Sequence, residues 1–389
     1  MKIAKRLEGV GEYYFSQKLR EIDEMNKQGR QVINLGIGSP DMPPNPEVIK
    51  VLHEEALKPG NHGYQNYKGS PVLRNAIAKW YKTWYKVDLD PVTDILPLIG
   101  SKEGIMHICM TYLNEGDSVL IPNPGYPTYQ SAAKIAGANV TAYTLKAENS
   151  WFPDFEAIEK DLPLNLKIMF VNYPHMPTGQ LPTKTFFTRL IAFAKKHNIL
   201  ICHDNPYSFI LPRSATEKPL SLLSIEGSKD VVIELNSLSK SHNMAGWRVG
   251  MLLGAKERID DVLRFKSNMD SGMFLPVQLS AAKALTLTAA WYNGVNDVYD
   301  KRRKKVYELL KILKCSSDEN QAGLFVWASI PPVYKDAYAL SDRILNESNV
   351  FITPGGIFGS AGDKYVRVSL CTGEERIEEA IGRVKALKS

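Results

Sequence analysis

The chain has 389 residues, which is long enough to bury a large core and to form one large domain with a smaller one beside it. Hydrophobic residues make up 44% and charged residues 23%, so the composition excludes a disordered chain and indicates a folded enzyme or binding protein. A formal net charge of +6 is modest over this length and does not indicate a nucleic-acid-binding protein.

Short apolar runs in the middle of the chain are predicted to be strands. They cover residues 95–100, 118–122, 139–145, 166–174, 199–206, 231–236 and 249–255. Helical patterns lie between several of them, and the clearest is at 183–197, where Phe186, Leu190 and Ile191 share one face. Strands that are apolar on both faces and alternate with helices indicate a mostly parallel sheet covered on both sides. The sequence therefore predicts an α/β domain with a seven-stranded sheet.

Residues at both ends of the chain are predicted to form a second, smaller unit. The C-terminal part contains an extended helical region, short strands at 323–330 and 365–371, and a glycine-rich turn at 354–362. No low-complexity linker separates these residues from the central part. We therefore expect a large domain at 46–274 and a small α+β domain built from 1–45 and 275–389.

A basic run at 300–311, "DKRRKKVYELLK", is the densest cluster of positive charge. Val306, Leu309 and Leu310 follow the charges at helical spacing, which predicts a helix whose charged face is solvated. Stacking aromatic residues are not interleaved with the charges, so we expect no nucleic-acid partner.

The N-terminus and the cysteines bear on location. No N-terminal stretch is apolar enough for a signal peptide, and no window reaches the ~18 apolar residues of a membrane span. The four cysteines are far apart in the sequence and have no metal-ligand spacing, which indicates reduced thiols and no metal site. We therefore expect a cytoplasmic protein that binds no membrane.

Polar and aromatic residues follow the predicted strands directly. In open sheets of this kind, ligands bind beyond the carboxyl ends of the strands. The segments at these ends are "GSKEG" (100–104), "NPGYPTY" (123–129), "NYPHMPTG" (172–179), "DNPY" (204–207) and "NSLSK" (236–240). We therefore expect a functional site at this edge of the sheet.

Lys240 follows the strand at 231–236 and precedes Arg248 by eight residues. A lysine that is partly desolvated and lies near another cation has a pKa below its ordinary value of about 10.4. Its neutral amine can attack a carbonyl group, as a Schiff-base lysine does. The alternative interpretation of a single lysine in a turn is an ordinary surface residue.

The surroundings of Lys240 indicate a phosphate site. Ser237 and Ser239 supply hydroxyl groups, and Arg248 supplies a bidentate cation. "GSKEG" follows a strand and opens a helix, so the backbone N–H groups near Ser101 and Lys102 can add an anion site at the helix N-terminus. Both features favour a bound phosphate group.

Three further residues favour an aromatic cofactor with a basic ring nitrogen. Asp204 follows an apolar strand, where an unpaired carboxylate is costly, and a protonated ring nitrogen would pair with it. Tyr207 can donate its phenol to a ring oxygen, and Tyr126 can stack on the ring. Each residue alone is more often a turn or a packed aromatic side chain. Together with the lysine and the phosphate site they describe a receptor for pyridoxal 5′-phosphate (PLP).

Over nearly its whole length the sequence resembles the fold-type I, class I and II aminotransferases. The segments that carry the resemblance, in the family's order, are "YQNYKGSPVLR" (64–74), "GSKEG", "PGYP" (124–127), "NYPHMPTG", "DNPY", "SLSK" with Arg248, and "YVRVSL" (365–370). The resemblance implies an enzyme that moves an amino group between an L-amino acid and a 2-oxo acid through PLP by a ping-pong mechanism. Lys240 would be the Schiff-base lysine and the proton shuttle.

The resemblance also implies roles for the other motif residues. Asp204 would pair with the ring nitrogen, Tyr207 would bind the ring oxygen, and Tyr126 would stack. The phosphate would be held by Ser101, Lys102, Ser237, Ser239 and Arg248, with Tyr64 reaching it from the neighbouring subunit of a homodimer. Substrate would be bound by Arg367, which would hold the α-carboxylate, by Gly38 and by Tyr13.

One position departs from the family pattern. Directly before Pro-Thr-Gly the family has an asparagine that donates to the ring oxygen, and this chain has Met176. A thioether cannot donate a hydrogen bond. One contact to the cofactor is therefore expected to be missing, unless His175 or Asn172 replaces it.

Other functions remain open at this point. The same cofactor serves carbon–sulfur β-lyases, because breaking a different bond at the substrate Cα gives a different reaction. A PLP-sensing regulator would need a DNA-binding segment, which the sequence before "INLGIGSPD" has no room for. A nicotinamide dehydrogenase is disfavoured, since "GIG" at 36–38 lacks the third glycine and the helix that should follow it. Within the aminotransferases, the motifs are closest to the branch of the LL-diaminopimelate, alanine and aspartate enzymes.

Overall fold

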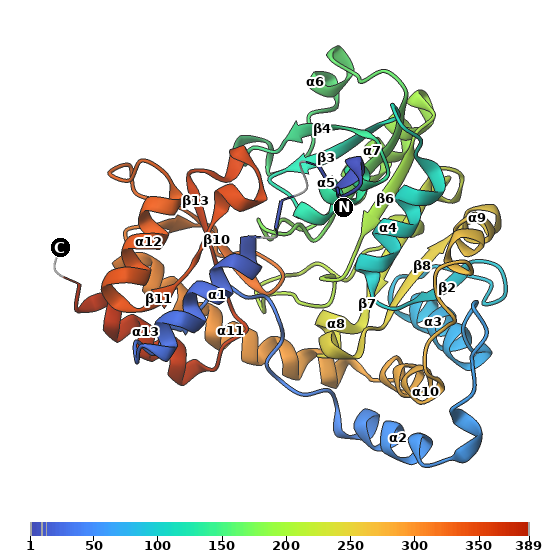
Figure 1. Ribbon diagram of the computed structural model, residues 1–389, viewed down its shortest axis with the longest axis horizontal. Helices are drawn as coiled ribbons and strands as arrows, with labels where there is room; N and C mark the ends of the chain where they lie inside the picture. The colour runs from blue at the N-terminus through green and yellow to red at the C-terminus, as the bar shows by residue number, and fades with distance from the viewer. Residues whose placement is uncertain (1, 9–10, 13, 388–389) are drawn as a thin grey trace.

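The computed structural model describes residues 2–8, 11, 12 and 14–387. Tyr13 lies outside these residues, so its predicted role in substrate binding stays a prediction. Figure 1 shows two regions, a large sheet with its helices and a smaller group of C-terminal elements with α1 against it. The helix α1 spans Tyr14–Lys27 and is the blue helix among the orange and red ones.

The large sheet has seven strands in the order β2-β8-β7-β6-β5-β3-β4. Their bounds are Ile95–Leu98 (β2), Ser118–Asn123 (β3), Asn139–Thr144 (β4), Leu166–Asn172 (β5), Leu200–Asp204 (β6), Val232–Ser237 (β7) and Gly250–Gly254 (β8). Only β8 runs antiparallel to its neighbours, β2 and β7, and the other pairs are parallel. The predicted mostly parallel, seven-stranded sheet is confirmed, and each predicted run overlaps one strand, with β3 and β7 each ending one residue beyond it.

Helices cover both faces of this sheet. Along β3, Leu120 packs into one hydrophobic cluster while Val119 and Ile121 pack into another, because successive strand residues point to opposite faces. The helices with side chains in the first cluster are α3 (Pro71–Trp84), α7 (Lys184–His197) and α10 (Leu275–Ala284). Those in the second are α4 (Ser101–Tyr112), α5 (Pro127–Ile135) and α9 (Lys256–Lys266). The sheet is buried on both faces, which explains its continuous apolar runs.

The smaller region contains two further sheets. The short strands β1 (Ile33–Asn34) and β11 (Val350–Phe351) pair in parallel and so join the two ends of the chain. A four-stranded sheet has the order β12-β13-β10-β9, with bounds Thr353–Pro354, Tyr365–Ser369, Phe325–Ser329 and Ser316–Ser317. The accompanying helices are α11 (Ala289–Ile312), α12 (Ala337–Ser348) and α13 (Glu374–Lys385). The remaining helices are α2 (Pro46–Ala56), α6 (Phe155–Lys160) and the one-turn α8 (Leu238–Ser241).

The expected division at residues 46 and 275 stays a prediction. Helix α10 packs against α2 and α3, and its alanines belong to the core of the large sheet. Along α11, Tyr292 still packs in that core, while Val295 packs in the core of the smaller region. We therefore propose that the second boundary lies within α11.

The basic run belongs to α11. The prediction that its charged side chains are solvated is wrong for two of them. Arg302 and Arg303 are only 6% and 3% exposed. Arg302 forms two contacts with the Asp41 carboxylate, at 2.6 and 2.9 Å, and donates to the carbonyl of Leu370 at 2.9 Å. Arg302 thus holds the N-terminal loop that contains Asp41 against the helix. Among the described residues, no helix is long and apolar enough to cross a membrane.

Candidate active site

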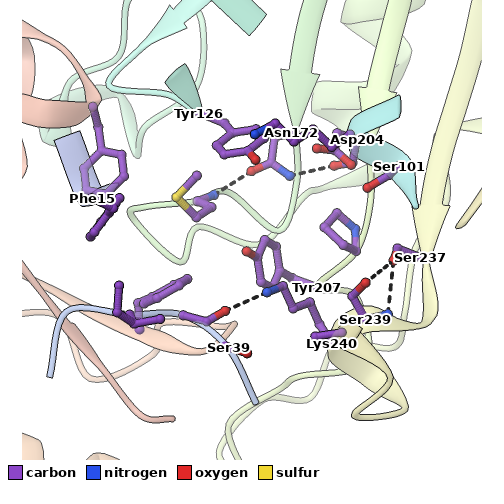
Figure 2. A pocket seen from close by; sticks show the side chains of 18 of the residues that line it. Phe15, Ser39, Ser101, Tyr126, Asn172, Asp204, Tyr207, Ser237, Ser239 and Lys240 are labelled. Atoms are coloured by element: carbon purple, nitrogen blue, oxygen red, sulfur yellow. Dashed lines mark hydrogen bonds between the residues drawn. The ribbon is translucent and has the colours of Figure 1, made fainter. Parts of the chain in front are cut away.

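A cavity of about 390 Å³ lies at the carboxyl ends of the large sheet and is closed on one side by residues of the smaller region. The predicted site residues that line it are Gly38, Ser101, Lys102, Tyr126, Asp204, Tyr207, Ser237, Ser239, Lys240, Arg248 and Arg367. Figure 2 shows Lys240, Asp204, Tyr207 and Tyr126 around the same space. The structure therefore brings together residues that are up to 329 positions apart, from Gly38 to Arg367.

Lys240 lies on α8, directly after β7, where a turn was predicted. Its Nζ donates a hydrogen bond to the carbonyl of Gly38 at 2.6 Å, as Figure 2 shows. Burial lowers the pKa of Lys240 below its ordinary value, and the charges of Arg367 and Arg248 lower it further. The amine is thus held inside the cavity in a setting that favours its neutral, nucleophilic form.

The end of the cavity near Arg248 has the features of an anion site. The Ser237 hydroxyl caps α8 by accepting from the Ser239 N–H at 3.1 Å, and it donates to the Ser239 hydroxyl at 2.8 Å. Gly100 precedes α4 with a φ of 83°, and a Cβ at that position would overlap the Arg248 guanidinium. The first N–H groups of α4 and the arginine therefore converge on one place, which suits a phosphate group.

Asp204 ends β6 and points into the cavity. Its Oδ2 accepts a hydrogen bond from the Tyr129 phenol at 2.9 Å. Its Oδ1 is buried and has no hydrogen-bond partner among the described residues. Burial raises the pKa of Asp204 to about 6, against the opposing effects of Tyr129, His203 and Lys240. A buried carboxylate oxygen without a donor is costly and requires a cationic or N–H partner in the cavity.

Two phenols border the same space. Tyr126 directly precedes α5 and packs edge-on against Tyr129, with ring centroids 5.5 Å apart. Tyr207 lies three residues after Asp204 and packs against Phe325, with ring centroids 6.3 Å apart. Burial raises the pKa of both phenols, so both stay protonated near neutral pH and can donate hydrogen bonds.

Arg367 lies on β13 and is only 4% exposed, unlike an ordinary strand arginine. It donates to the carbonyl of Gly36 at 2.8 Å and contacts the Met176 sulfur at 3.4 Å. Its guanidinium carbon lies 3.8 Å from the centroid of the Phe325 ring and 4.6 Å from that of Phe358. This packing fixes a cation in a low-dielectric wall of the cavity, where it can bind a carboxylate strongly.

The turn with Met176 resolves one open question. Asn172 lines the cavity, donates to the backbone carbonyl of Asp204 at 2.6 Å and accepts from the Met176 N–H at 2.8 Å. His175 contacts the Thr178 hydroxyl at 2.8 Å and does not line the cavity, and burial lowers its pKa to about 3. Of the two replacements considered for the missing asparagine, only Asn172 borders the site.

Tyr64 lies elsewhere in this chain. It is 95% exposed and does not line the cavity. It borders a separate hollow together with the neighbouring residues His62–Gln65 and Ser271–Phe274. A tyrosine this exposed can reach a phosphate site only on another subunit, so the prediction for Tyr64 depends on the predicted homodimer.

Several residues of the cavity were not predicted. Tyr129 is the donor to Asp204, and Phe15, Phe325 and Phe358 surround the Arg367 guanidinium. Tyr129 follows Tyr126 by three residues, which places both on the same side of a helix start and is a usable signal. The three phenylalanines carry no signal of this kind, because each looks like an ordinary core residue.

One group of metal-type ligands lies outside the cavity. Side-chain atoms of Glu103, His107 and Asp270 come within 4.8 Å of one another. The Lys266 ammonium contacts both Asp270 oxygens, at 2.5 and 2.6 Å. This ammonium already compensates the carboxylate, and the group gives no reason to assign a metal.

The chain is similar to known proteins over nearly its whole length. Residues 30–384 match the family model described as "Aminotransferase class I and II". The chain is 40% identical over 388 residues to the LL-diaminopimelate aminotransferase of Dehalococcoides mccartyi, covering 100% of this chain and 99% of the relative. It is 39% identical over 387 residues to the enzyme of the same name from Aquifex aeolicus, with 100% and 99% coverage. The structure of BacF from Bacillus subtilis superposes with a TM-score of 0.94 at 36% identity, over 99% of this chain and 98% of that one.

Proposed function

We propose specific residue roles and a substrate class for this chain, which belongs to the class I and II aminotransferases and is a PLP-dependent enzyme of fold type I. The family match confirms the predicted fold, cofactor and aminotransfer reaction. The match does not favour the alternative of a carbon–sulfur β-lyase. Because the relatives are named as aminotransferases, it favours an enzyme over the alternative of a PLP-sensing regulator.

The residues of the cavity fit PLP. The buried Asp204 Oδ1 needs a donor, and the protonated ring nitrogen of PLP is one. Ser101, Ser237, Ser239 and Arg248 would hold the phosphate, with Lys102 contributing its backbone N–H. Bound PLP would supply an aldehyde for the amine to attack and an electron sink for the carbanion chemistry at the substrate Cα.

The chain's own groups would then carry out the transfer. Lys240 would supply the attacking amine and later move a proton at the substrate Cα. Asp204 would keep the ring nitrogen protonated, Tyr207 would donate to the ring oxygen, and Tyr126 would pack on the ring. Arg367 would bind the α-carboxylate of the amino acid. The observation that carries this assignment is that the Lys240 amine and the unpaired Asp204 oxygen border one cavity.

Gly38 can have a second part beside its predicted one in substrate binding. Its carbonyl accepts from Lys240, and a Cβ at this position would overlap the Phe325 ring. The missing side chain thus makes room for the phenylalanine that packs on Arg367. We propose that Gly38 shapes the substrate end of the cavity in this way.

For the amino donor we propose LL-diaminopimelate, because the relatives at 39–40% identity over the whole chain carry that name. A second candidate class is apolar or aromatic amino acids. It is favoured by the walls beside Arg367, which include Phe15, Ile37, Phe325 and Phe358. These side chains would pack against an apolar substrate without supplying polar contacts.

A half-reaction screen distinguishes the two classes. PLP-loaded enzyme is mixed with LL-diaminopimelate, aspartate, alanine, methionine or phenylalanine in the absence of a 2-oxo acid, and the rate of loss of visible absorbance is measured. The proposal predicts the highest rate per donor concentration with LL-diaminopimelate. A preference for phenylalanine and methionine would replace it with the second candidate, and release of ammonia and pyruvate from a cysteine conjugate would indicate a lyase.

We also propose that the enzyme is a cytoplasmic homodimer whose active site is completed by Tyr64 of the neighbouring subunit. The location agrees with four cysteines that are all free thiols. The dimer is supported by the exposure of Tyr64 and by exposed apolar side chains near it, among them Tyr67, Val72 and Phe274.

Subunit mixing tests the dimer. Tyr64→Ala and Lys240→Ala homodimers are each expected to be impaired, since every site lacks one group. A mixed dimer would contain one site with both changes and one site with neither, so activity should rise to about half of the wild-type value per mixed dimer. Equal activity before and after subunit exchange, measured with wild-type mixing as the control, would contradict a shared site.

Met176→Asn should shift the pH midpoint of the cofactor's visible absorbance downward. The family's asparagine donates to the ring oxygen and stabilises its ionised form, whereas a thioether cannot. One added hydrogen bond to a charged group corresponds to a shift of about one pH unit. Absorbance titrations of both proteins measure it, and Met176→Leu serves as the control that adds no donor. Identical midpoints for Met176→Asn and wild type would contradict the effect of this side chain on the ionisation of the ring oxygen.

A further inference from the structure

A second buried polar cluster lies on the other face of the large sheet, directly behind Asp204. His203 precedes Asp204 on β6, and Glu234 is its register partner on β7. His203 Nδ1 lies 2.8 Å from Glu234 Oε2, and both side chains are 0% exposed. Because neighbouring strand residues point to opposite faces, this pair lies away from the cavity while Asp204 points into it. No role proposed above uses the pair.

The hydrogen bonds of the cluster determine where its protons lie. His203 Nε2 is 3.0 Å from the backbone carbonyl of Tyr173, which can only accept, so this nitrogen donates. The Glu234 carboxylate already accepts from the Tyr81 phenol at 2.8 Å, from the Ser221 hydroxyl at 2.8 and 2.9 Å, and from the Leu222 N–H at 3.0 Å. Three such donors stabilise the ionised form of the carboxylate, and His203 Nδ1 then donates to it. In this arrangement the pair is an imidazolium and a carboxylate.

The same cluster reaches both sides of the cofactor cavity. Asn236 donates to the Tyr81 phenol at 2.9 Å and accepts from the N–H of Ser237 at 2.8 Å, and Ser237 begins the phosphate end of the site. Tyr173, which accepts from His203, directly follows Asn172, whose amide donates to the Asp204 carbonyl. The cluster thus connects the carboxyl ends of β5, β6 and β7, which carry Asn172, Asp204 and Ser237.

We propose that the His203–Glu234 pair is a positioning device that places the histidine end of an ion pair behind Asp204 and fixes the separation of the strand ends that hold PLP. The proposal rests on the role of Asp204 given above. Burying two charges is costly, and complete hydrogen bonding of this kind is needed to offset the cost. Two apolar side chains would fill the same space without that cost. His203 and Glu234 are therefore positioning residues, and neither touches the cofactor.

The charges around Asp204 make the effect predictable. The groups that act on it are Tyr129 from α5, Lys240 from α8, and His203 from its own strand, and all three lower its pKa against the effect of burial. Burial raises the pKa of Tyr126, Tyr207 and Cys202, and the charge of Asp204 adds to this effect. Without the imidazolium, the Asp204 carboxylate would hold the proton on the ring nitrogen more tightly. It would also stabilise other protonated groups of the cofactor.

Glu234→Gln is the decisive variant, because a buried imidazolium that loses its carboxylate is expected to lose its proton. The pH midpoint of the visible absorbance of PLP-loaded enzyme should rise by about half a unit to one unit, and His203→Asn should shift it in the same direction. Tyr81→Phe is the matched control. It removes a hydrogen bond of the same cluster but no charge, so it should weaken PLP binding without moving the midpoint.

The outcomes separate the explanations. An unchanged midpoint in Glu234→Gln, or an equal shift in Tyr81→Phe, would overturn the proposal. Failure of wild-type enzyme to bind PLP would instead overturn the proposed function. If neither charge variant folds, ¹⁵N-histidine spectra of the cofactor-free wild type decide the matter. They should show protons on both ring nitrogens of His203, and a His203 ring with one proton would contradict the proposal.

Discussion

Lys240→Ala is expected to lower the rate of amino transfer by at least about 10⁴-fold, because it removes both the attacking amine and the group that moves the proton at the substrate Cα. The change should leave the fold intact, since among the described residues the Lys240 amine makes one hydrogen bond, to the Gly38 carbonyl. Steady-state rates with the best donor from the half-reaction screen measure the loss.

Lys256→Ala is the matched control for this variant. Lys256 lies on α9, its side chain is 59% exposed, and its ion pair with Asp260 is on the surface. Its removal should leave the rate within a factor of two and the stability nearly unchanged. A Lys240→Ala enzyme that kept the wild-type rate would refute the assignment of the attacking amine.

Asp204→Asn is expected to have two opposite effects, a loss of activity and a gain in stability. Replacing the carboxylate by an amide removes the charge that keeps the ring nitrogen protonated, and we expect the rate to fall at least about 100-fold, or about 2.7 kcal/mol. The same change removes a buried carboxylate that has one unpaired oxygen in the cofactor-free protein. That protein should therefore become more stable.

The pH dependence of this gain follows from the pKa of Asp204. Burial raises it to about 6 from an ordinary value of 3.8, so the folded state binds the proton more tightly than the unfolded state does. Stability is therefore highest at low pH and falls as the pH rises from about 4 to 6, and above pH 6 the full cost applies. Removing the carboxylate should stabilise the cofactor-free protein by about 1–3 kcal/mol at pH 7 and by about half as much at pH 5.

Urea unfolding of the cofactor-free wild type and Asp204→Asn at the two pH values measures the gain. Tyr129→Phe is the useful comparison, because it removes the one donor to the Asp204 side chain and should destabilise the protein. A stability difference between Asp204→Asn and wild type that did not change with pH would show that the buried carboxylate is not its cause.

Much of the large domain could be predicted from the sequence because its signals are local. The seven strands are continuous apolar runs, since both faces of the sheet are buried by helices, and their ends carry the polar residues. Asp204 and Lys240 could be selected for this reason, as Asp204 is the last residue of β6 and Lys240 comes three residues after β7. Their roles in PLP binding additionally required the family resemblance.

Other features depend on contacts that no local pattern records. Arg302 looks like a solvated helix residue until the loop with Asp41 is packed against it. The position of Arg367 in a wall of aromatic rings requires the N-terminal Phe15 and the C-terminal Phe325 and Phe358 to meet. The hydrogen bonds of His203 could not be predicted either, because they depend on a neighbouring strand and on the carbonyl of Tyr173.

The most direct test of the whole account is to find where PLP attaches. PLP-loaded enzyme is reduced with borohydride and digested, and the peptides are analysed by mass spectrometry. We predict that the reduced cofactor is covalently bound to Lys240 and that prior addition of an amino donor, which converts the cofactor to its amine form, prevents the labelling. Attachment to another lysine, or no attachment at all, would contradict the assignment of this cavity as the active site.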